Sequence, residues 1–236
     1  QDMSTDEMLA LVRSAPEMKG QSLSGQVSTP TSYLIPSQGK TVGKVAVLDL
    51  GIKKSTLEHL AMRGLEIEVF PADISAAEIL ASSPDGFFFS NGPGDPEASG
   101  DQVSMLRELL GTNKPFFGIC FGNQLLGRAL GFDTYKLKFG HRGINQPVIN
   151  KETGRVEVTA HNHGFAVKLE SDSAESPLGF GQVKVSHRGL NDQVVEGLEC
   201  VDIPAFSVQY HPEAAAGPHD SHHLFDKFLD AIKESK

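Results

Sequence analysis

One cysteine of the chain has surroundings that suit it to act as a nucleophile. Cys120 follows a short apolar run, residues 115–119, that is typical of a strand buried on both faces, and it precedes apolar residues at helical spacing as far as Gly131. Gly118 and Gly122 flank it, as a sharp strand-to-helix corner requires, because side chains there would collide across the turn. Free N–H groups at a helix start favour a thiolate and can hold an oxyanion. Taken alone, the pattern fits an inert core thiol equally well.

A histidine and a glutamate at the end of a later strand could supply the base that such a cysteine needs. His211-Pro-Glu213 directly follows a predicted strand, 205–210, so a parallel sheet would bring His211 to the same edge as Cys120. Glu213 could orient the imidazole and stabilise its protonated form. An isolated His-Pro-Glu is more simply a strand end with a solvated glutamate, but next to a cysteine corner the catalytic interpretation is favoured.

A glycine-rich loop, Asn91-Gly-Pro-Gly-Asp-Pro96, follows another predicted strand. Its glycines let the backbone approach a ligand closely. It lacks the Lys-Ser/Thr of a phosphate-binding loop and the spacing of a dinucleotide-binding loop. A plain tight turn is the simple alternative, but its position at a strand end favours a role in binding substrate or an oxyanion.

The elements expected to position these residues alternate between strand and helix from Lys44 onward. Strands are predicted at 45–50, 65–70, 86–90 and 115–119, and helices at 55–64, 75–81, 101–110 and 121–130. Capping boxes are predicted at Ser55-x-x-Glu58 and Ser75-x-x-Glu78. Four successive βα units predict an α/β fold of three layers, with a mainly parallel sheet and helices on both faces. A hairpin at 146–160, extended runs within 183–204 and a closing helix from 219 or 220 to 232 predict a small antiparallel addition.

The first forty residues differ from the rest. A capping box at Ser4-x-x-Glu7 predicts a short helix that Pro16 ends, and the following residues are rich in Ser, Gly, Pro, Gln and Thr. We therefore expect residues 1–40 to be a linker from an N-terminal domain that is missing upstream of Gln1, and residues 41–236 to form the working domain.

Composition excludes several classes of protein. A net charge of −9 argues against a general nucleic-acid surface, and no stretch of about 20 apolar residues is present that could span a membrane. The chain has two cysteines, Cys120 and Cys200, which favours a reducing, cytoplasmic setting over a disulfide-rich secreted one. We assign no role to Cys200.

Taken together, Gly118-Ile-Cys120-Phe-Gly122-Asn-Gln124, His211-Pro-Glu213 and the glycine loop resemble the class I, or triad, glutamine amidotransferases. Three further stretches resemble the small, glutaminase subunits of carbamoyl phosphate synthetases in particular: Asp49-Leu-Gly-Ile-Lys53, Lys138-Phe-Gly-His-Arg-Gly-Ile-Asn-Gln-Pro147 and Asn162-His-Gly-Phe-Ala166. The resemblance covers roughly residues 41–236.

This resemblance implies roles for individual residues. Cys120 would attack the side-chain amide of L-glutamine, His211 would move protons, and Glu213 would orient His211. The N–H groups of Gly94 and Phe121 would form the oxyanion hole. Glutamine would be held by Gly92, Gly94, Phe121, Gln124, Asn162, Gly164 and Phe165.

The resemblance also implies partners. Ammonia from glutamine would pass to a large synthetase subunit in a heterodimer, which would hold ATP, Mg and bicarbonate and make carbamoyl phosphate for arginine and pyrimidine biosynthesis. No cofactor is expected in this chain. Two departures stand out: Asn123 occupies a position where the family often has His, and we expect the serine that the small subunit's N-terminal domain contributes to glutamine binding to be absent together with that domain. Alternatives are an amidotransferase serving an anthranilate or guanylate synthetase, and a non-catalytic scaffold of the same fold.

A last cluster contains residue types that can bind metal ions: His219, Asp220, His222 and His223. We interpret it as the polar start of the closing helix, and we predict no metal site.

Overall fold

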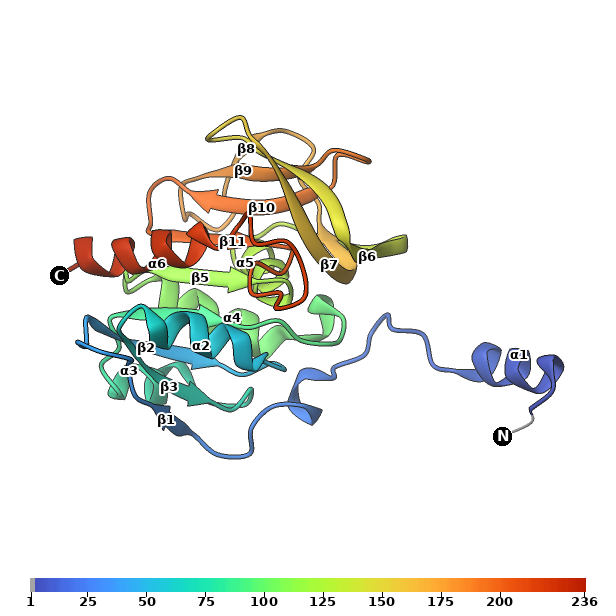
Figure 1. Ribbon diagram of the computed structural model, residues 1–236, viewed down its shortest axis with the longest axis horizontal. Coiled ribbons are helices and arrows are strands. Elements are labelled where there is room, and N and C mark those ends of the chain that lie inside the picture. Colours follow the sequence, from blue (N-terminus) through green and yellow to red (C-terminus); the bar gives the residue numbers. More distant parts are fainter. Residues whose placement is uncertain (1–2) are drawn as a thin grey trace.

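The computed structural model describes residues 3–236 and shows a single mixed sheet with helices packed on both faces (Figure 1). The sheet has the strand order β1-β3-β2-β4-β5-β11-β10-β9-β6-β7, with β8 paired to β9 beside this path. Its first half contains β1 (Tyr33–Ile35), β2 (Gly43–Leu48), β3 (Leu65–Phe70), β4 (Gly86–Phe89), β5 (Phe116–Ile119) and β11 (Ala205–Val208). Its second half contains β6 (Thr134–Asn150), β7 (Val156–Val167), β8 (Ser173–Glu175), β9 (Gln182–Gly189) and β10 (Val195–Cys200).

Five strands, β3, β2, β4, β5 and β11, run parallel and form the centre of the fold. Their side chains point alternately to the two faces, as the period of a strand requires. Ala46 and Leu48 of β2 face one hydrophobic cluster, and Val45 and Val47 face the other. Because both faces are covered, β4 and β5 are apolar throughout, which is the pattern that predicted buried strands.

The helices divide between the two faces of the sheet. One face is covered by α3 (Ala76–Ala81), α4 (Gly100–Leu110) and α5 (Phe121–Ala129), and the other by α2 (Lys54–Met62) and α6 (His223–Glu234). The predicted three-layer arrangement is therefore confirmed. Ser75 and Glu78 form the predicted capping box at the start of α3, with reciprocal side-chain and backbone hydrogen bonds.

Three predicted boundaries were wrong. Helix α2 begins after Lys53, whose side chain makes no capping hydrogen bond, so Ser55 lies inside the helix and forms no capping box. The closing helix begins at His223, three or four residues later than expected. The predicted hairpin exists, but its strands β6 and β7 extend far beyond residues 146–160, and register shifts interrupt their pairing.

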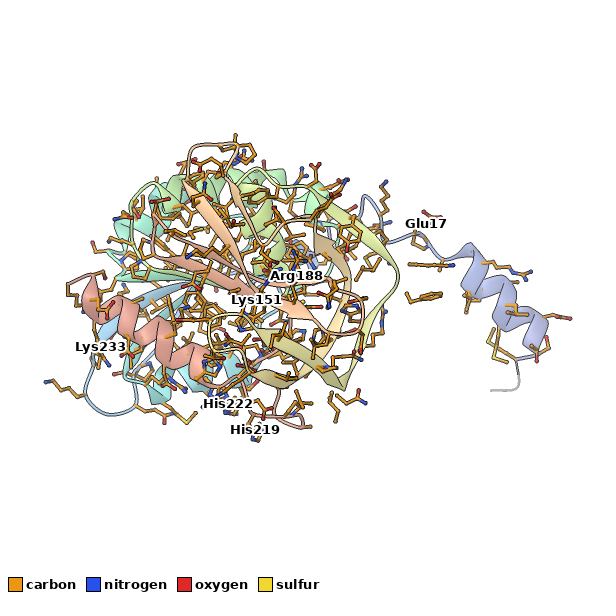
Figure 2. The ribbon with its side chains drawn as sticks, turned by 90° about the horizontal axis from the view of Figure 1, so that it is seen from above. Glu17, Lys151, Arg188, His219, His222 and Lys233 are labelled. Atoms are coloured by element: carbon orange, nitrogen blue, oxygen red, sulfur yellow. The ribbon has the colours of Figure 1, made fainter. Side chains whose placement is uncertain are left out.

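The N-terminal segment both projects from the body and packs against it. Helix α1 (Thr5–Ser14) has the predicted capping box between Ser4 and Glu7 and buries no residue. Figures 1 and 2 show it standing apart from the sheet, with Glu17 on the segment that leads back to the body. Farther along, β1 pairs antiparallel with β3, and the short 3-10 helix Ser24–Gln26 lies between α1 and β1 in sequence order. No helix among residues 3–236 is long and apolar enough to cross a membrane.

Candidate active site

Cys120 occupies the predicted corner between β5 and α5. Its backbone has φ 54° and ψ −96°, a strained combination for a residue with a side chain, and only 5% of the residue is exposed. The Cys120 N–H donates to Val208 O at 2.8 Å, which ties the corner to the neighbouring strand. A Cβ atom at Gly118 would come within 2.7 Å of the Gly122 backbone, and one at Gly122 within 2.3 Å of Phe89 O. The corner therefore requires both glycines, as the sequence predicted.

His211 and Glu213 follow the strand next to the corner. Strands β5 and β11 are parallel, with Ile119 opposite Val208, so both chains leave the sheet at the same edge. The His211 N–H donates to Ala160 O at 2.8 Å, and its Nδ1 lies 2.8 Å from Glu213 Oε1. His211 is 6% exposed and Glu213 is fully buried. The structure thus brings together the three residues that the sequence had selected.

Electrostatics in this group favour the protonated form of His211 and the ionised form of Glu213. Burial works to lower the pKa of His211, but the charge and hydrogen bond of Cys120, followed by those of Glu213, raise it to about 10. Burial works to raise the pKa of Glu213, but the hydrogen bond and charge of His211, with the charge of Lys53, hold it below its usual value. A thiolate–imidazolium pair is the reactive form of a cysteine nucleophile with a histidine base.

Lys53 also belongs to the group formed by Cys120, His211 and Glu213. It lies in the Asp49–Lys53 motif, but no role was predicted for it from the sequence. Its Nζ lies 3.0 Å from Glu213 Oε1, the same oxygen that binds His211. Lys53 is 43% exposed and the glutamate is fully buried, so the lysine is the solvent-facing counter-ion of a buried carboxylate. Lys53 lies at the end of the loop after β2, directly before α2. Because functional residues of parallel sheets lie beyond the carboxyl ends of the strands, this position could have marked Lys53 as a candidate site residue from the sequence.

The glycine loop lies beside Cys120 and is held by the segment before β1. Gly94 has φ +119°, and a Cβ atom at Gly92 would come within 2.2 Å of Leu50 O. Asp95 N donates to Gln21 O at 2.8 Å, and Gly20 N donates to Asp95 Oδ2 at 2.8 Å. The predicted linker therefore supports the loop expected to hold an oxyanion.

A cavity of about 570 Å³ opens onto Cys120 and His211. It is of ordinary size for a small-molecule site. Its charged lining side chains among the described residues, apart from histidines, are Lys53, Lys136 and Arg142, which favour a ligand that carries a carboxylate. Other lining residues are Met18, Val27, Gly51, Asn91, Gly92, Pro93, Gly94, Gln124, Asn162, His163, Gly164 and Phe165.

Most residues predicted to bind glutamine line this cavity, and two predicted residues do not. Phe121 places its side chain in the core between sheet and helices, so its candidate contribution is the backbone N–H alone. Glu213 lies behind His211. Sequence reasoning missed Met18, Val27, Lys53, Lys136 and Arg142, which come from loops and from β6, where no periodic pattern indicated a site.

A buried amide network fixes the wall of the cavity next to Cys120. Gln124 Nε2 donates to Phe165 O at 3.0 Å and to Gln209 Oε1 at 3.1 Å. Asn123 Nδ2 also donates to Gln209 Oε1, while Gln209 Nε2 donates to Cys120 O at 3.3 Å. Ser207 Oγ donates to Asn123 Oδ1 at 2.9 Å. Asn123 is fully buried, and its side chain hydrogen-bonds to Gln209 and Ser207.

Comparison with known proteins accounts for this arrangement. The family described as glutamine amidotransferase class-I matches residues 46–231. The chain belongs to this family. Among curated relatives, the carbamoyl phosphate synthase small chain of Streptomyces avermitilis is 58% identical over 226 residues, covering 96% of this chain and 59% of that one.

Other relatives carry the same name. The small chain from Bifidobacterium longum is 57% identical over 239 residues, covering 98% of this chain and 59% of that one, and that from Mycobacterium tuberculosis is 52% identical over 230 residues, covering 96% and 61%. The chain thus spans about three-fifths of the length of these relatives. A solved structure of a putative GMP synthase protein from Thermoplasma acidophilum has a TM-score of 0.67 at 20% identity, covering 84% of this chain and 96% of that one, which shows the shared fold.

Proposed function

We propose that this chain hydrolyses L-glutamine to glutamate and ammonia through a thioester on Cys120. The observation that carries the proposal is the placement of Cys120, His211 and Glu213 at one sheet edge, beside a cavity with basic lining. Membership of the class-I amidotransferase family supports the same chemistry.

The first half of the reaction forms the thioester. The Cys120 thiolate attacks the side-chain amide carbon of glutamine, and the negative charge that develops on the amide oxygen is stabilised by the N–H groups of Gly94 and Phe121. The His211 imidazolium gives its proton to the departing nitrogen, which leaves as ammonia. Glu213 and Lys53 keep the imidazole oriented through both steps.

The second half releases glutamate. Neutral His211 takes a proton from water, the hydroxide attacks the thioester carbonyl, and the Cys120 thiolate leaves with His211 again protonated. The candidate contacts for the amino-acid end of glutamine are Gln124, Asn162, Gly164 and Phe165 with the backbone of Gly92, which all line the cavity.

We also propose that the ammonia serves a large carbamoyl phosphate synthase chain, for arginine and pyrimidine biosynthesis in the cytoplasm. The names of the curated relatives support this partner, and identity above 50% extends over almost the whole chain. ATP, Mg and bicarbonate would bind to that partner. The two free, buried thiols fit a reducing compartment.

Glutaminase activity, measured as glutamate release with and without the large chain, tests both parts of the proposal. We expect Cys120→Ser to abolish glutamate release and to retain the circular dichroism spectrum of the wild type. A Cys120→Ser protein that is as active as the wild type would overturn the mechanism. Failure of the wild type to support glutamine-dependent carbamoyl phosphate formation by the large chain, while still releasing glutamate, would overturn the partner alone.

A further inference from the structure

Next to the cavity, which His163 also lines, three histidines and a glutamate converge from three strands of the antiparallel half of the sheet. His161 and His163 lie two residues apart on β7 and so share a face, His141 of β6 pairs in register with His163, and Glu196 comes from β10. One candidate ligand atom from each of the four residues lies within 4.8 Å of all the others. His161 and His163 are 5% and 4% exposed, and Glu196 is fully buried.

We propose that His161 Nδ1, His163 Nε2 and Glu196 Oε2 bind a zinc ion that ties β7 to β10 and fixes the cavity segment 162–165. The two nitrogens are 3.1 Å apart, and Glu196 Oε2 lies 3.7 Å from His161 Nδ1 and 3.8 Å from His163 Nε2. Ligand atoms about 2.0–2.2 Å from a tetrahedral zinc ion lie about 3.3–3.6 Å from one another, so small side-chain adjustments suffice. Two histidines and one glutamate form a donor set that zinc commonly takes, with the fourth position left for water.

Among the described residues, the hydrogen bonds around the cluster pair His161 Nδ1 with His163 Nε2 and leave the inward-facing Oε2 of Glu196 without a partner. Glu196 Oε2 has no hydrogen-bond partner among the described residues although it is fully buried, which is costly for a carboxylate. His163 Nδ1 lies 2.9 Å from Phe165 O, and a carbonyl can only accept, so Nδ1 carries the proton and Nε2 presents a bare lone pair to the cluster.

The protons of the neighbouring His161 favour the same arrangement. Thr159 Oγ1 lies 2.8 Å from Gln146 O and 2.7 Å from His161 Nε2. If the single hydroxyl proton goes to the Gln146 carbonyl, His161 must donate from Nε2, and its Nδ1 is then a second bare lone pair facing His163 Nε2. A cation between them satisfies both nitrogens and the unpaired glutamate oxygen together, whereas a proton on His161 Nδ1 leaves that oxygen unpaired.

Outer contacts hold each proposed ligand in place. Phe165 O fixes His163, and Thr159 fixes His161. His141 Nδ1 lies 2.9 Å from Glu196 Oε1, and its Nε2 lies 2.8 Å from Asp192 Oδ2, so a protonated His141 orients the third ligand. Such partners are typical of metal sites, where they set the tautomer and orientation of the ligands.

Two other groups of side chains in the chain could bind zinc, so the experiment must distinguish binding there from binding at this cluster. One is the pair formed by Cys120 and His211 at the cavity. The other is the set His59, His219 and His222 near the start of α6. The His222 ring stacks on that of His219 and meets that of His59 edge-on, with centroids 4.5 Å apart in both pairs, and Figure 2 shows His219 and His222 next to one another. The decisive titration therefore uses protein without a polyhistidine tag that carries Cys120→Ser, and His222→Gln serves as the matched control.

Cobalt and zinc titration of this protein tests the proposal. We expect one Co²⁺ per chain, with the intense visible absorption of a tetrahedral site, and its displacement by one equivalent of Zn²⁺. Glu196→Gln and His161→Gln should each weaken binding by more than about 100-fold, because losing even an outer partner of a ligand costs about 10- to 100-fold. His222→Gln should leave it unchanged. Zinc should also raise the melting temperature of the Cys120→Ser protein, and this readout requires no ligand variant to fold.

Three results would overturn the proposal. The first is no stoichiometric binding and no zinc-dependent rise in melting temperature in the Cys120→Ser protein. The second is binding that disappears with His222→Gln and survives Glu196→Gln. The third is binding that requires Cys120. None of these outcomes bears on glutamine hydrolysis, which is measured separately as glutamate release.

Discussion

The ammonium group of Lys53 lies 3.0 Å from the buried carboxylate of Glu213, so the glutamate that orients His211 has two cationic partners. The loop after β2 thereby contributes to a group whose other members follow β5 and β11. Through this contact, the Asp49–Lys53 motif supplies a counter-ion to the carboxylate that binds His211.

We expect Lys53→Met to lower kcat/KM for glutamine by about 5- to 10-fold. A hydrogen bond to a charged group contributes about 1.5–3 kcal/mol. Because Lys53 is partly exposed and solvent screens its charge, we expect its contact with Glu213 to contribute no more than the lower end of this range, which corresponds to the stated fold-change. Loss of the lysine charge raises the pKa of Glu213, so the acidic limb of the pH profile should move to higher pH. Lys54→Met is the matched control, because Lys54 pairs with Glu58 on the surface of α2. Equal effects of both substitutions would contradict the assignment.

The raised pKa of His211 predicts how stability depends on pH. Because the pKa rises from 6.5 in the unfolded chain to about 10 in the folded one, the folded protein holds the proton more tightly, and the resulting stabilisation is complete below pH 6.5. It is lost as the pH rises toward 10. The free energy of unfolding of the wild type, relative to that of His211→Asn, should therefore fall across this interval in urea denaturation. A constant difference would show that His211 has an ordinary pKa in the folded protein.

The two cysteines should differ sharply in reactivity. Burial, with smaller effects from Glu199 and Asp202, raises the pKa of Cys200 to about 12, so its thiol is inert near neutral pH. Cys120 lies at the cavity beside a protonated histidine. We expect a glutamine-analogue chloroketone to modify Cys120 alone, as seen by peptide mass spectrometry, with free glutamine slowing the reaction. Cys200→Ser should label like the wild type, and modification of Cys200 at a similar rate would contradict this account.

Sequence reasoning succeeded where local chemistry dictates structure and failed where distant strands decide it. The corner at Cys120 was predictable, because only glycine fits at Gly118 and Gly122 and because periodicity changes from strand to helix there. The cap at Ser55 was wrong because the chain enters α2 earlier, directly from the loop that carries Lys53.

The antiparallel half was predicted least completely. The exposed face of β6 carries an irregular mixture of polar and apolar residues, and register shifts interrupt its pairing with β7. Neither feature produces a regular alternation in the sequence. The convergence of His141, His161, His163 and Glu196 depends on that pairing, so the sequence alone predicted no metal site.

A methyl group at Gly122 should destabilise the fold. Its Cβ would lie 2.3 Å from Phe89 O, a backbone atom that can move only with the sheet. We expect Gly122→Ala to cost about 1–3 kcal/mol, the usual range for overpacking, and to lower activity by displacing Cys120. Gly100→Ala is the matched control, because a Cβ atom there meets nothing within 4 Å and alanine favours the helix. Equal melting temperatures of the two variants would contradict the steric argument.

Gln209 should be needed for both stability and substrate affinity, although it does not line the cavity. Its Oε1 accepts hydrogen bonds from Asn123 and Gln124, and Gln124 in turn holds the Phe165 carbonyl at the cavity wall. Gln209→Leu keeps the volume but removes the acceptor that these two donors share. Because a buried unsatisfied group costs about 1–3 kcal/mol, we expect a loss of about 2–3 kcal/mol and a raised KM for glutamine.

Ser207→Ala separates the effect on KM from a general loss of stability. It removes one hydrogen bond to Asn123 and leaves the contacts of Gln124 intact. The serine variant should lose about 1 kcal/mol, the net value of a single hydrogen bond, with KM unchanged. If both variants raise KM in proportion to their loss of stability, the effect comes from general loosening of the site. If only Gln209→Leu raises KM, the amide network positions the wall that contacts glutamine.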